Sequence, residues 1–431
     1  MAAAVSSPVS SVSEICRAAK GASRILARTD TAVKDGALEA IATALEVRLD
    51  EILAANERDM ELAHGAGIDA ALLDRLRLDA VRVAGIALAV RQIAALGDPV
   101  GEVIDGHRLA NGLDVRKVRV PLGVVAVVYE ARPNVTIDAA ALCLKSGNAI
   151  VLRGSSTAMH SNLALAQIAS EAAVAAGLPE GSVSLVAGGG REELAELATQ
   201  REAVDLIIPR GGESLKEALQ AVATVPVIYA ASGNCHVFVD QSADLDSAEE
   251  IVLNAKTQRP GVCNAAETLL VHENVADRFL PRILRSLGEA GVLVRGDRRT
   301  LGIASASLKG ESVVVEAAGE DDWGREYLAP IIAVGVVGSV EDAIEHVGRY
   351  GSGHSEAIVT QDSSSARAFQ LGVDAACVYV NASTRFTDGG EFGMGAEIGN
   401  STQKLHARGP IGLRELCTFK YLIEGDGHVR V

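Results

Sequence analysis

The chain has 431 residues, of which 48% are hydrophobic and 22% charged. That is enough for two or three domains at about 150 residues each. Lysine and arginine total 40 against 56 acidic residues, a formal net charge of −16. An acidic chain without a basic run repels nucleic acid and anionic membranes, so neither is expected as a partner. Apolar runs such as Ile331–Val337 fall far short of the ~18 residues that span a bilayer, and the N-terminus does not resemble a secretory signal.

The six cysteines are scattered, with no C-x-x-C pair, and no H-E-x-x-H motif is present. This usage is typical of reduced thiols in a cytoplasmic protein, and it favours neither a disulfide framework nor a metal site. His346 and His354 flank a Gly/Ser turn, but no complete ligand set accompanies them, so structural roles are favoured for both.

The first expected elements are helices. Residues 12–96 are rich in alanine and leucine at helical spacing, which predicts three or four helices, interrupted near residues 65–67. The turn Gly97-Asp98-Pro99 ends this helical region. Asn111-Gly112 then lies between two short polar/apolar stretches over residues 109–120, which predicts a two-residue β-hairpin.

After Pro121, apolar strand-like runs alternate with helical stretches. The expected strands cover residues 124–129, 149–152, 182–186, 205–208 and 225–230. The expected helices between them cover residues 137–145, 160–176, 191–199 and 214–223. This alternation predicts a parallel sheet with helices on both faces, an α/β domain suited to nucleotide binding. A second α/β stretch over residues 245–376 and a last strand over residues 416–423 complete the chain.

Two glycine loops, at residues 187–190 and 209–212, each follow a strand and precede a helix. Such loops can present backbone N–H groups to phosphates, although for each loop taken alone an ordinary strand–helix turn is favoured. Cys263 follows Lys256 and Arg259 and is flanked by small residues. A cationic, accessible setting makes a thiol nucleophilic, and a small hydrophobic residue in the core is the open alternative.

Several basic residues lie in or beside turns rich in Gly, Pro, Asn or Ser. An acidic protein that bound an anionic substrate would need such localised positive charges. For any single one of these residues, an ordinary solvated surface position is the favoured interpretation. These residues are Arg132, Lys145, Arg153, Arg210, Arg259, Arg385, Lys404 and Arg408.

Longer motifs make the chain recognisable. They are Lys256–Glu267, Tyr129–Val135, Val378–Gly390, Gly395–Gly399, Ser401–Pro410 and Val340–Ile358. With these motifs the chain resembles the gamma-glutamyl phosphate reductase family of the aldehyde dehydrogenase superfamily, over nearly its whole length. Val347 and Gly353 depart from residues that are usual in the last motif.

The resemblance implies roles residue by residue. Cys263 matches the family's nucleophile. Three further matches concern the cofactor, NADPH or NADP. Arg153 matches the family's position near the adenine ribose, and Glu326 matches the residue that binds the nicotinamide ribose. The loop of Pro209, Gly211 and Gly212 matches the loop near the pyrophosphate. No metal is implied. Turn position and charge favour a further set for binding substrate phosphate and carboxylate: Arg132, Asn134, Arg259, Asn264, Asn381 and Arg385.

Two departures from the superfamily's motifs bear on the expected reaction. Residues 230–234 read Ala-Ala-Ser-Gly-Asn where hydrolytic members carry a Glu-Leu-Gly-Gly base, and residues 130–134 replace a Trp-Asn pair that helps hold the oxyanion. A reductase has no need to activate water, because water would hydrolyse its thioester. Whether Asn134, Asn264 or a backbone N–H stabilises the oxyanion stays open.

The expected fold is α/β and aldehyde dehydrogenase-like, with two doubly wound domains and a small β oligomerisation flap. Residues 1–101 and 121–240 form the cofactor domain, 241–377 the catalytic domain, 102–120 and 409–431 the flap, and 378–408 a return segment. The expected activity is NADPH-dependent reduction of L-glutamyl 5-phosphate to L-glutamate 5-semialdehyde in proline biosynthesis, by a homo-oligomer; association with glutamate 5-kinase is left open. The alternatives are an oxidising NAD(P)-dependent semialdehyde dehydrogenase and a catalytically silent scaffold.

Overall fold

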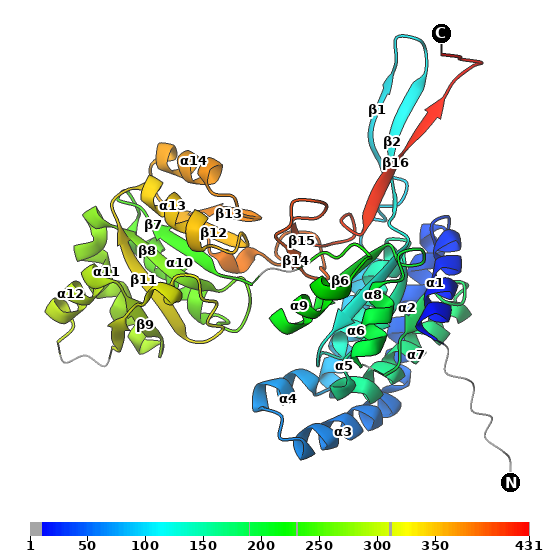
Figure 1. The fold of residues 1–431 in the computed structure, drawn as a ribbon, viewed down its shortest axis with the longest axis horizontal. Helices are drawn as coiled ribbons and strands as arrows, with labels where there is room; N and C mark the ends of the chain where they lie inside the picture. Colours follow the sequence, from blue (N-terminus) through cyan, green and yellow to red (C-terminus); the bar gives the residue numbers. More distant parts are fainter. Residues whose placement is uncertain (1–10, 189, 230–231, 310–312, 431) are drawn as a thin grey trace. The chain divides into compact units, whose positions relative to one another are not determined.

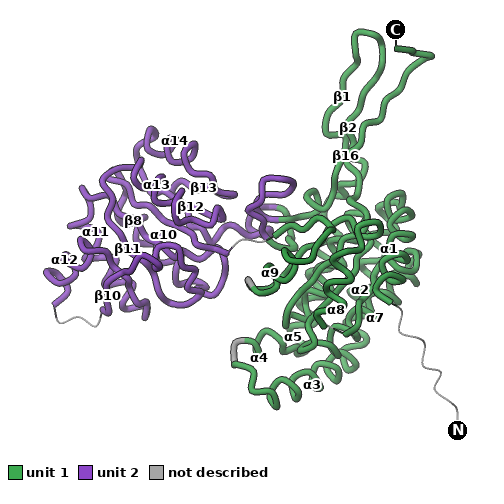
Figure 2. Tube along the Cα trace, in the orientation of Figure 1, with its two compact units in different colours: residues 1–229, 394–399, 411–431 green, residues 230–393, 400–410 purple. Residues whose placement is uncertain are grey.

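A computed structural model describes residues 11–188, 190–229, 232–309 and 313–430. The chain divides into two compact units (Figure 2). Unit 1 comprises Met1–Tyr229, Met394–Gly399 and Ile411–Val431, and unit 2 comprises Ala230–Gly393 and Asn400–Pro410. No helix in the described part of the chain is both long and apolar enough to cross a membrane.

Unit 1 begins with helices and is built on a parallel sheet (Figure 1). Its helices are α1 (Val12–Leu26), α2 (Thr31–Val47), α3 (Leu49–Gly65), α4 (Ala70–Leu76), α5 (Ala80–Ala94), α6 (Asn134–Lys145), α7 (Met159–Ala175), α8 (Arg191–Ala198) and α9 (Glu213–Val222), with the 3₁₀ turn η1 (Ser156–Ala158). Its sheet has the order β5-β4-β3-β6, from β3 (Val124–Tyr129), β4 (Ala149–Arg153), β5 (Val183–Leu185) and β6 (Leu206–Arg210). All residues of β3 and β4 are buried because helices cover both faces, which confirms the predicted parallel sheet.

Two predictions for unit 1 need correction. The described residues between 12 and 94 form five helices instead of three or four, because the short α4 follows the interruption near Gly65. The strand predicted over residues 225–230 is absent from the described residues 225–229, where Val227 makes only a single bridge to Ile207. Pro226 has no N–H to continue a ladder, and residue 230 lies outside the described residues.

A three-stranded antiparallel sheet projects from the rest of unit 1 (Figure 1). It has the order β1-β2-β16, from β1 (Val103–Arg108), β2 (Asp114–Pro121) and β16 (Cys417–Glu424). Asn111 and Gly112 lie in the β1–β2 connection, and Gly112 has φ +95°, so a hairpin forms at the predicted place. The predicted two-residue turn is wrong, because residues 109–113 separate the strands and the Leu109 N–H donates to the Leu113 carbonyl at 2.8 Å. The C-terminal strand thus pairs with a hairpin about three hundred residues earlier.

Unit 2 is a second parallel α/β unit, with sheet order β10-β9-β11-β8-β7-β12-β13. The strands are β7 (Cys235–Val239), β8 (Ala266–His272), β9 (Leu293–Gly296), β10 (Val315–Ala317), β11 (Ile331–Val337), β12 (Ser355–Val359) and β13 (Cys377–Val380). The helices are α10 (Leu245–Thr257), α11 (Glu273–Glu289), α12 (Arg298–Ser307), α13 (Val340–Tyr350) and α14 (Ser363–Gly372), with the short elements η2 (Glu320–Asp322), η3 (Thr384–Phe386), β14 (Asn400–Ser401) and β15 (Gly409–Pro410).

Alternate residues of the central strands of unit 2 point into two separate cores. Val237 and Leu269 pack into the core with α10 and α11, whereas Phe238 and Leu270 pack into the core with α13 and α14. Side chains alternate across a strand, so an apolar strand buries both of its faces. The segments that precede β7, β8 and β12 contain Gly233, Cys263 and His354, and this packed sheet fixes where those segments begin.

Candidate active site

Cys263 lies in the turn between α10 and β8 of unit 2. All six cysteines belong to the described part of the chain and are free thiols; five are buried, whereas Cys263 is half-buried. Burial raises the pKa of Cys16 to about 11 and that of Cys417 to about 12, so these thiols stay protonated. Among the cysteines, accessibility therefore distinguishes Cys263.

The backbone of Gly233 packs directly against that of Cys263. A Cβ atom at Gly233 would lie 1.7 Å from the carbonyl oxygen of Cys263, so no side chain fits there. The Gly233 N–H donates to Oε1 of Glu326 at 2.7 Å, and the thiol of Cys235 donates to the Cys263 carbonyl at 3.2 Å. Part of the segment that replaces the hydrolytic base, residues 230 and 231, lies outside the described residues. The described part places the backbone of Gly233 against that of Cys263.

Asn264 connects the Cys263 turn to the loop that carries Arg385. Its Nδ2 donates to the carbonyl oxygens of Thr387 at 2.9 Å and Arg385 at 3.3 Å, and the Thr384 hydroxyl donates to the Asn264 carbonyl at 2.7 Å. Oδ1 of Asn264 is buried without a protein partner. This side chain therefore positions the turn with its amide nitrogen and leaves only its oxygen for another role.

Two of the predicted arginines share one electrostatic neighbourhood with the thiol. Nε of Arg385 donates to Oε1 of Gln258 at 2.8 Å, which orients the guanidinium. Burial lowers the pKa of Arg385, the positive charge of Arg259 acts in the same direction, and Asp388 and Cys263 oppose both. An arginine remains cationic after such a shift. Arg385 thus lies near Cys263 and also near the positive charge of Arg259.

Asn381 occupies a different kind of position from the other predicted substrate residues. It has φ +54°, which asparagine tolerates better than most residues. Its Oδ1 accepts from the N–H of Thr360 at 2.8 Å and its Nδ2 donates to the Thr360 carbonyl at 2.9 Å. The described contacts of Asn381 therefore shape the chain after β13.

A buried chain of polar side chains lies next to the Cys263 turn, which contacts it through Asn264 and Thr387. Nδ1 of His354 lies 2.8 Å from the hydroxyl of Ser355, which lies 2.6 Å from the hydroxyl of Thr387. The Tyr379 hydroxyl lies 2.7 Å from the same threonine oxygen. Burial lowers the pKa of His354 to about 4, so its imidazole is neutral at physiological pH.

His354 predicts a measurable loss of stability in acid. Its folded pKa lies below the ordinary value of 6.5, so its contribution is complete above pH 6.5 and is lost as pH falls towards about 4. We expect the unfolding free energy of the wild-type protein to fall by about 2 kcal/mol more than that of His354→Gln between about pH 6.5 and 5. Urea unfolding at both pH values measures this difference, and equal pH dependence in the two proteins would contradict it.

The remaining predicted residues lie in unit 1, at the carboxyl ends of its strands. Arg153 ends β4, and its guanidinium donates to the Gly190 carbonyl at 2.7 Å. Burial lowers its pKa, and the charge of Glu193 opposes this. Pro209 belongs to β6, and Gly211 and Gly212 connect it to α9. The Leu215 N–H in the first turn of α9 donates to the Gly212 carbonyl at 3.2 Å, and the earlier N–H groups at this helix start precede the intrahelical ladder.

A cavity of about 170 Å³ lies beside the end of β4. It is lined by Gly154, Ser155, Met159, His160, Asn162, Leu163, Leu185, Val186, Ala187 and Gly188. A Cβ atom at Gly154 would lie 2.0 Å from Nδ2 of Asn162, a buried donor without a protein partner. The slot is mostly apolar, and the buried Ser155 hydroxyl and Nδ2 of Asn162 have no hydrogen-bond partner in it. Its volume can hold only part of a nicotinamide dinucleotide. The glycine loop predicted at residues 187–190 contributes to this slot, although residue 189 lies outside the described residues.

Arg132 and Asn134 follow β3 in unit 1. Nδ2 of Asn134 donates to Oδ2 of Asp138 at 2.9 Å, and burial raises the pKa of Asp138 to about 6. Among the described residues, no group of three or more His, Cys, Asp or Glu side chains is arranged to hold a metal ion.

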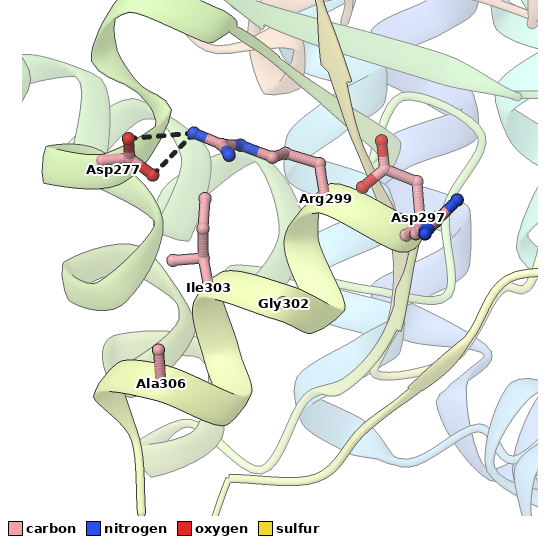
Figure 3. A pocket seen from close by; sticks show the side chains of 7 residues that line it. Asp277, Asp297, Arg299, Gly302, Ile303 and Ala306 are labelled. Carbon is pink, nitrogen blue, oxygen red and sulfur yellow. Dashed lines mark hydrogen bonds and ion pairs between the residues drawn. The ribbon is translucent and has the colours of Figure 1, made fainter.

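A second hollow, on α11 and α12 of unit 2, contains none of the predicted site residues. It has a volume of about 720 Å³, and the Asp277–Arg299 ion pair lies at its side (Figure 3). Arg299 Nη2 lies 2.9 Å from Oδ2 of Asp277, and both side chains are more than half exposed. Such an exposed pair contributes little to stability, so it serves below as a control.

Comparison with known proteins decides the family. Residues 2–293 match the model of the aldehyde dehydrogenase family. The chain is 55% identical to a gamma-glutamyl phosphate reductase of Moorella thermoacetica over 96% of this chain and 97% of that one, and 52% identical to one of Thermobifida fusca over 97% and 98%. The chain belongs to the gamma-glutamyl phosphate reductases of the aldehyde dehydrogenase family.

Solved structures agree with this placement. A gamma-glutamyl phosphate reductase of Thermotoga maritima superposes with a TM-score of 0.94 at 47% identity, covering 98% of this chain and all of that one. An acetylating aldehyde dehydrogenase of Geobacillus thermoglucosidasius, 19% identical with a TM-score of 0.67 over 97% of both chains, shares the fold. The predicted aldehyde dehydrogenase-like α/β fold is confirmed. This family consists of oxidoreductases that use a nicotinamide cofactor.

Sequence reasoning assigned no role to two residues that the structure brings to the site. Glu267 forms a buried ion pair with Lys256 below the nucleophile turn, and Gly233 packs on Cys263. Both residues stand inside segments that the sequence singled out. A lysine and a glutamate on either side of the turn that carries Cys263 were the available signal for the pair.

Proposed function

We propose that this chain reduces L-glutamyl 5-phosphate to L-glutamate 5-semialdehyde and phosphate with NADPH, the second step of proline biosynthesis. Near-full-length relatives named gamma-glutamyl phosphate reductase support this reaction. The observation that carries it is the half-buried Cys263, close to the charges of Arg259 and Arg385 and packed against the backbone of Gly233. This is an electropositive thiol site in which the position of the hydrolytic base is taken by other residues.

The proposed chemistry uses the Cys263 thiolate as nucleophile. The sulfur attacks the γ-acyl carbon, the acyl C–O bond breaks, and phosphate leaves with its electron pair, so that a thioester forms on Cys263. Phosphate is a good leaving group and needs little acid assistance. NADPH, when bound, supplies the hydride that reduces the acyl group to the aldehyde oxidation level. Cleavage of the C–S bond then releases the semialdehyde and returns the thiolate.

Substrate binding is assigned to Arg132, Asn134, Arg259, Asn264, Asn381 and Arg385. In this proposal Arg259 and Arg385 bind the anionic groups directly, because the charge of Arg385 lies near the thiol and that of Arg259 lies near Arg385. Asn264 and Asn381 act mainly by positioning, since their amide nitrogens already donate to backbone carbonyls. The buried Oδ1 of Asn264 accepts hydrogen bonds only, so it cannot stabilise an oxyanion.

Cofactor binding is assigned to the ends of the strands in unit 1 and to Glu326 in unit 2. Arg153 takes the adenine ribose side, where a guanidinium favours the additional phosphate of NADPH. Pro209, Gly211 and Gly212 place the N-terminus of α9 near the pyrophosphate. Glu326 takes the nicotinamide ribose. Residues 1–101 and 121–240 form the cofactor domain in this scheme, 241–377 the catalytic domain, and 378–408 the return segment.

The flap of residues 102–120 and 409–431 is proposed to join copies of the chain into a homo-oligomer. On β16, Phe419, Tyr421 and Ile423 expose 45%, 56% and 59% of their surface. Exposed apolar side chains on a sheet with open edges need a partner. Light scattering at micromolar concentration is expected to give a mass of at least two chains, and a monomer would contradict the assignment. A cytoplasmic location belongs to the same proposal, and association with glutamate 5-kinase stays open.

A forward assay tests the reaction. Glutamate, ATP and a glutamate 5-kinase generate the unstable acyl phosphate in place, and NADPH oxidation is followed with this enzyme present or omitted. We expect NADPH oxidation to require ATP, the kinase and this enzyme together. NADPH oxidation with glutamate alone, or none under any condition, would contradict the proposed reaction.

A further inference from the structure

Lys256 and Glu267 form a buried ion pair at the two ends of the nucleophile turn. Lys256 lies in the last turn of α10 and Glu267 near the start of β8; Nζ and Oε2 are 2.5 Å apart and both side chains are 0% exposed. Residues 258–265 between them carry Cys263. Burying two charges costs several kcal/mol per ion, and an apolar pair of equal volume is often as stable. Stability alone therefore does not account for this pair.

The other carboxylate oxygen of Glu267 holds a strained backbone position. Oε1 accepts the N–H of Leu328 at 3.2 Å, and Leu328 has φ +52°. A leucine in this left-handed region is strained and persists only where the surroundings hold it. Leu328 follows Glu326 by two residues. Glu267 thus fixes the segment that carries Glu326.

Glu326 connects this segment to the backbone that packs against Cys263. Its Oε1 accepts the N–H of Gly233 at 2.7 Å. A Cβ atom on Gly233 would lie 1.7 Å from the Cys263 carbonyl oxygen, so the two backbones are in direct contact. The contacts therefore run from Glu267 through the 326–328 segment and Gly233 to Cys263, and the turn itself leads back to Glu267. Every member belongs to unit 2.

We propose that Lys256 and Glu267 are positioning residues that lock the Cys263 turn and the Glu326 segment into one frame. The frame sets the distance between the thiolate and the residue assigned to the nicotinamide ribose, and in that respect the inference rests on the proposed function. A misplacement of about 1 Å at a reacting centre can cost about 10²-fold in rate. The pair therefore acts on catalysis without touching the substrate.

Burial of the pair agrees with this role. It raises the pKa of Glu267 to about 7, and the charge of Lys256 opposes that shift. Burial likewise lowers the pKa of Lys256, opposed by the charge of Glu267. Each group keeps its charge mainly through its partner, so removal of either one leaves an uncompensated buried group and loosens the turn.

The test compares the full-length variants Glu267→Gln, Glu267→Asp and Lys256→Met/Glu267→Gln with wild type, and Asp277→Asn is the matched control for an exposed pair. Three readouts are followed at a temperature where thermal melts show each protein folded. They are the pH profile of Cys263 alkylation by iodoacetamide, the protection of Cys263 by NADPH, and the separate kcat and KM for NADPH. Wild-type behaviour is expected from Asp277→Asn.

Both single variants are expected to lower kcat about 10-fold or more, raise KM for NADPH, change the alkylation profile and weaken protection. The double variant removes both charges at similar volume, so its melting temperature is expected to return towards wild type while the kinetic defects persist. Glu267→Asp keeps the charge and shortens the reach, so it tests positioning where Glu267→Gln fails to fold.

Wild-type alkylation, protection and kinetics in folded Glu267→Gln or Glu267→Asp would overturn the inference. Kinetics that recover together with the melting temperature in the double variant would also overturn it, because the pair would then matter for stability alone. The alkylation profile needs neither substrate nor cofactor. A wild-type enzyme that fails to reduce the acyl phosphate would therefore refute the proposed function and leave the positioning role to be decided by alkylation.

Discussion

Replacement of Cys263 by alanine is expected to lower kcat/KM at least about 10⁴-fold, a loss of about 5.4 kcal/mol of transition-state stabilisation. The thioester cannot form without the sulfur, so only hydride transfer to a bound acyl phosphate would remain. Binding of NADPH is expected to be unchanged, because the residues assigned to the cofactor retain their contacts. Stopped-flow measurement of NADPH oxidation in a single turnover, with fluorescence titration of NADPH, separates the two effects.

The matched control is Cys16→Ala. Cys16 is a buried thiol in α1 whose pKa burial raises to about 11, so it is neither accessible nor ionised. This variant is expected to keep kcat, with at most a modest loss of stability from the small cavity. Retention of more than about one hundredth of wild-type activity in Cys263→Ala would contradict the nucleophile assignment.

Arg385→Ala is expected to raise the KM for the acyl phosphate or lower kcat by about 10-fold or more, equal to about 1.4 kcal/mol. Its guanidinium is oriented by Gln258 and lies near the charges of Arg259 and Cys263. A bidentate contact to phosphate or carboxylate is lost when the side chain is truncated. Arg259→Ala is expected to act in the same direction, and steady-state kinetics measures both.

Arg349→Ala provides the comparison for general charge effects. Arg349 lies on α13, its side chain is 68% exposed, and it pairs with the equally exposed Glu320. Its removal changes the net charge of the protein by the same amount as Arg385→Ala. Because Arg349 is not among the residues assigned to the substrate, wild-type kinetics are expected. Equal defects in Arg349→Ala and Arg385→Ala would remove Arg385 from the substrate site and assign the effect to long-range electrostatics.

Periodicity in the sequence predicted most of the fold because apolar spacing reports burial directly. The strand Val124–Tyr129 has the predicted bounds, and the hairpin at Asn111-Gly112 lies where its turn chemistry placed it. The strand predicted around Pro226 failed because proline cannot continue a ladder, and an apolar run alone does not reveal that. The pairing of β2 with β16 depends on contacts distant in sequence, which periodicity does not specify.

The site was less predictable than the fold. From composition and spacing, Cys263 could be either a nucleophile or a small core residue. The resemblance carried by the longer motifs predicted the nucleophile. Asn264 was predicted to bind substrate, yet its amide nitrogen donates to the carbonyls of Arg385 and Thr387, a contact across the fold that no local pattern encodes. The ion pair of Lys256 and Glu267 is of the same kind, since it forms only when the turn between them closes.

The reverse reaction tests the central claim most directly. Glutamate 5-semialdehyde and NADP⁺ are incubated with the enzyme in the presence and absence of inorganic phosphate, and NADPH is followed by absorbance. We predict that NADPH forms only with phosphate present, because phosphate must release the acyl group from Cys263, and that Cys263→Ala forms none. NADPH formation at the same rate without phosphate would contradict the account and identify an oxidising semialdehyde dehydrogenase.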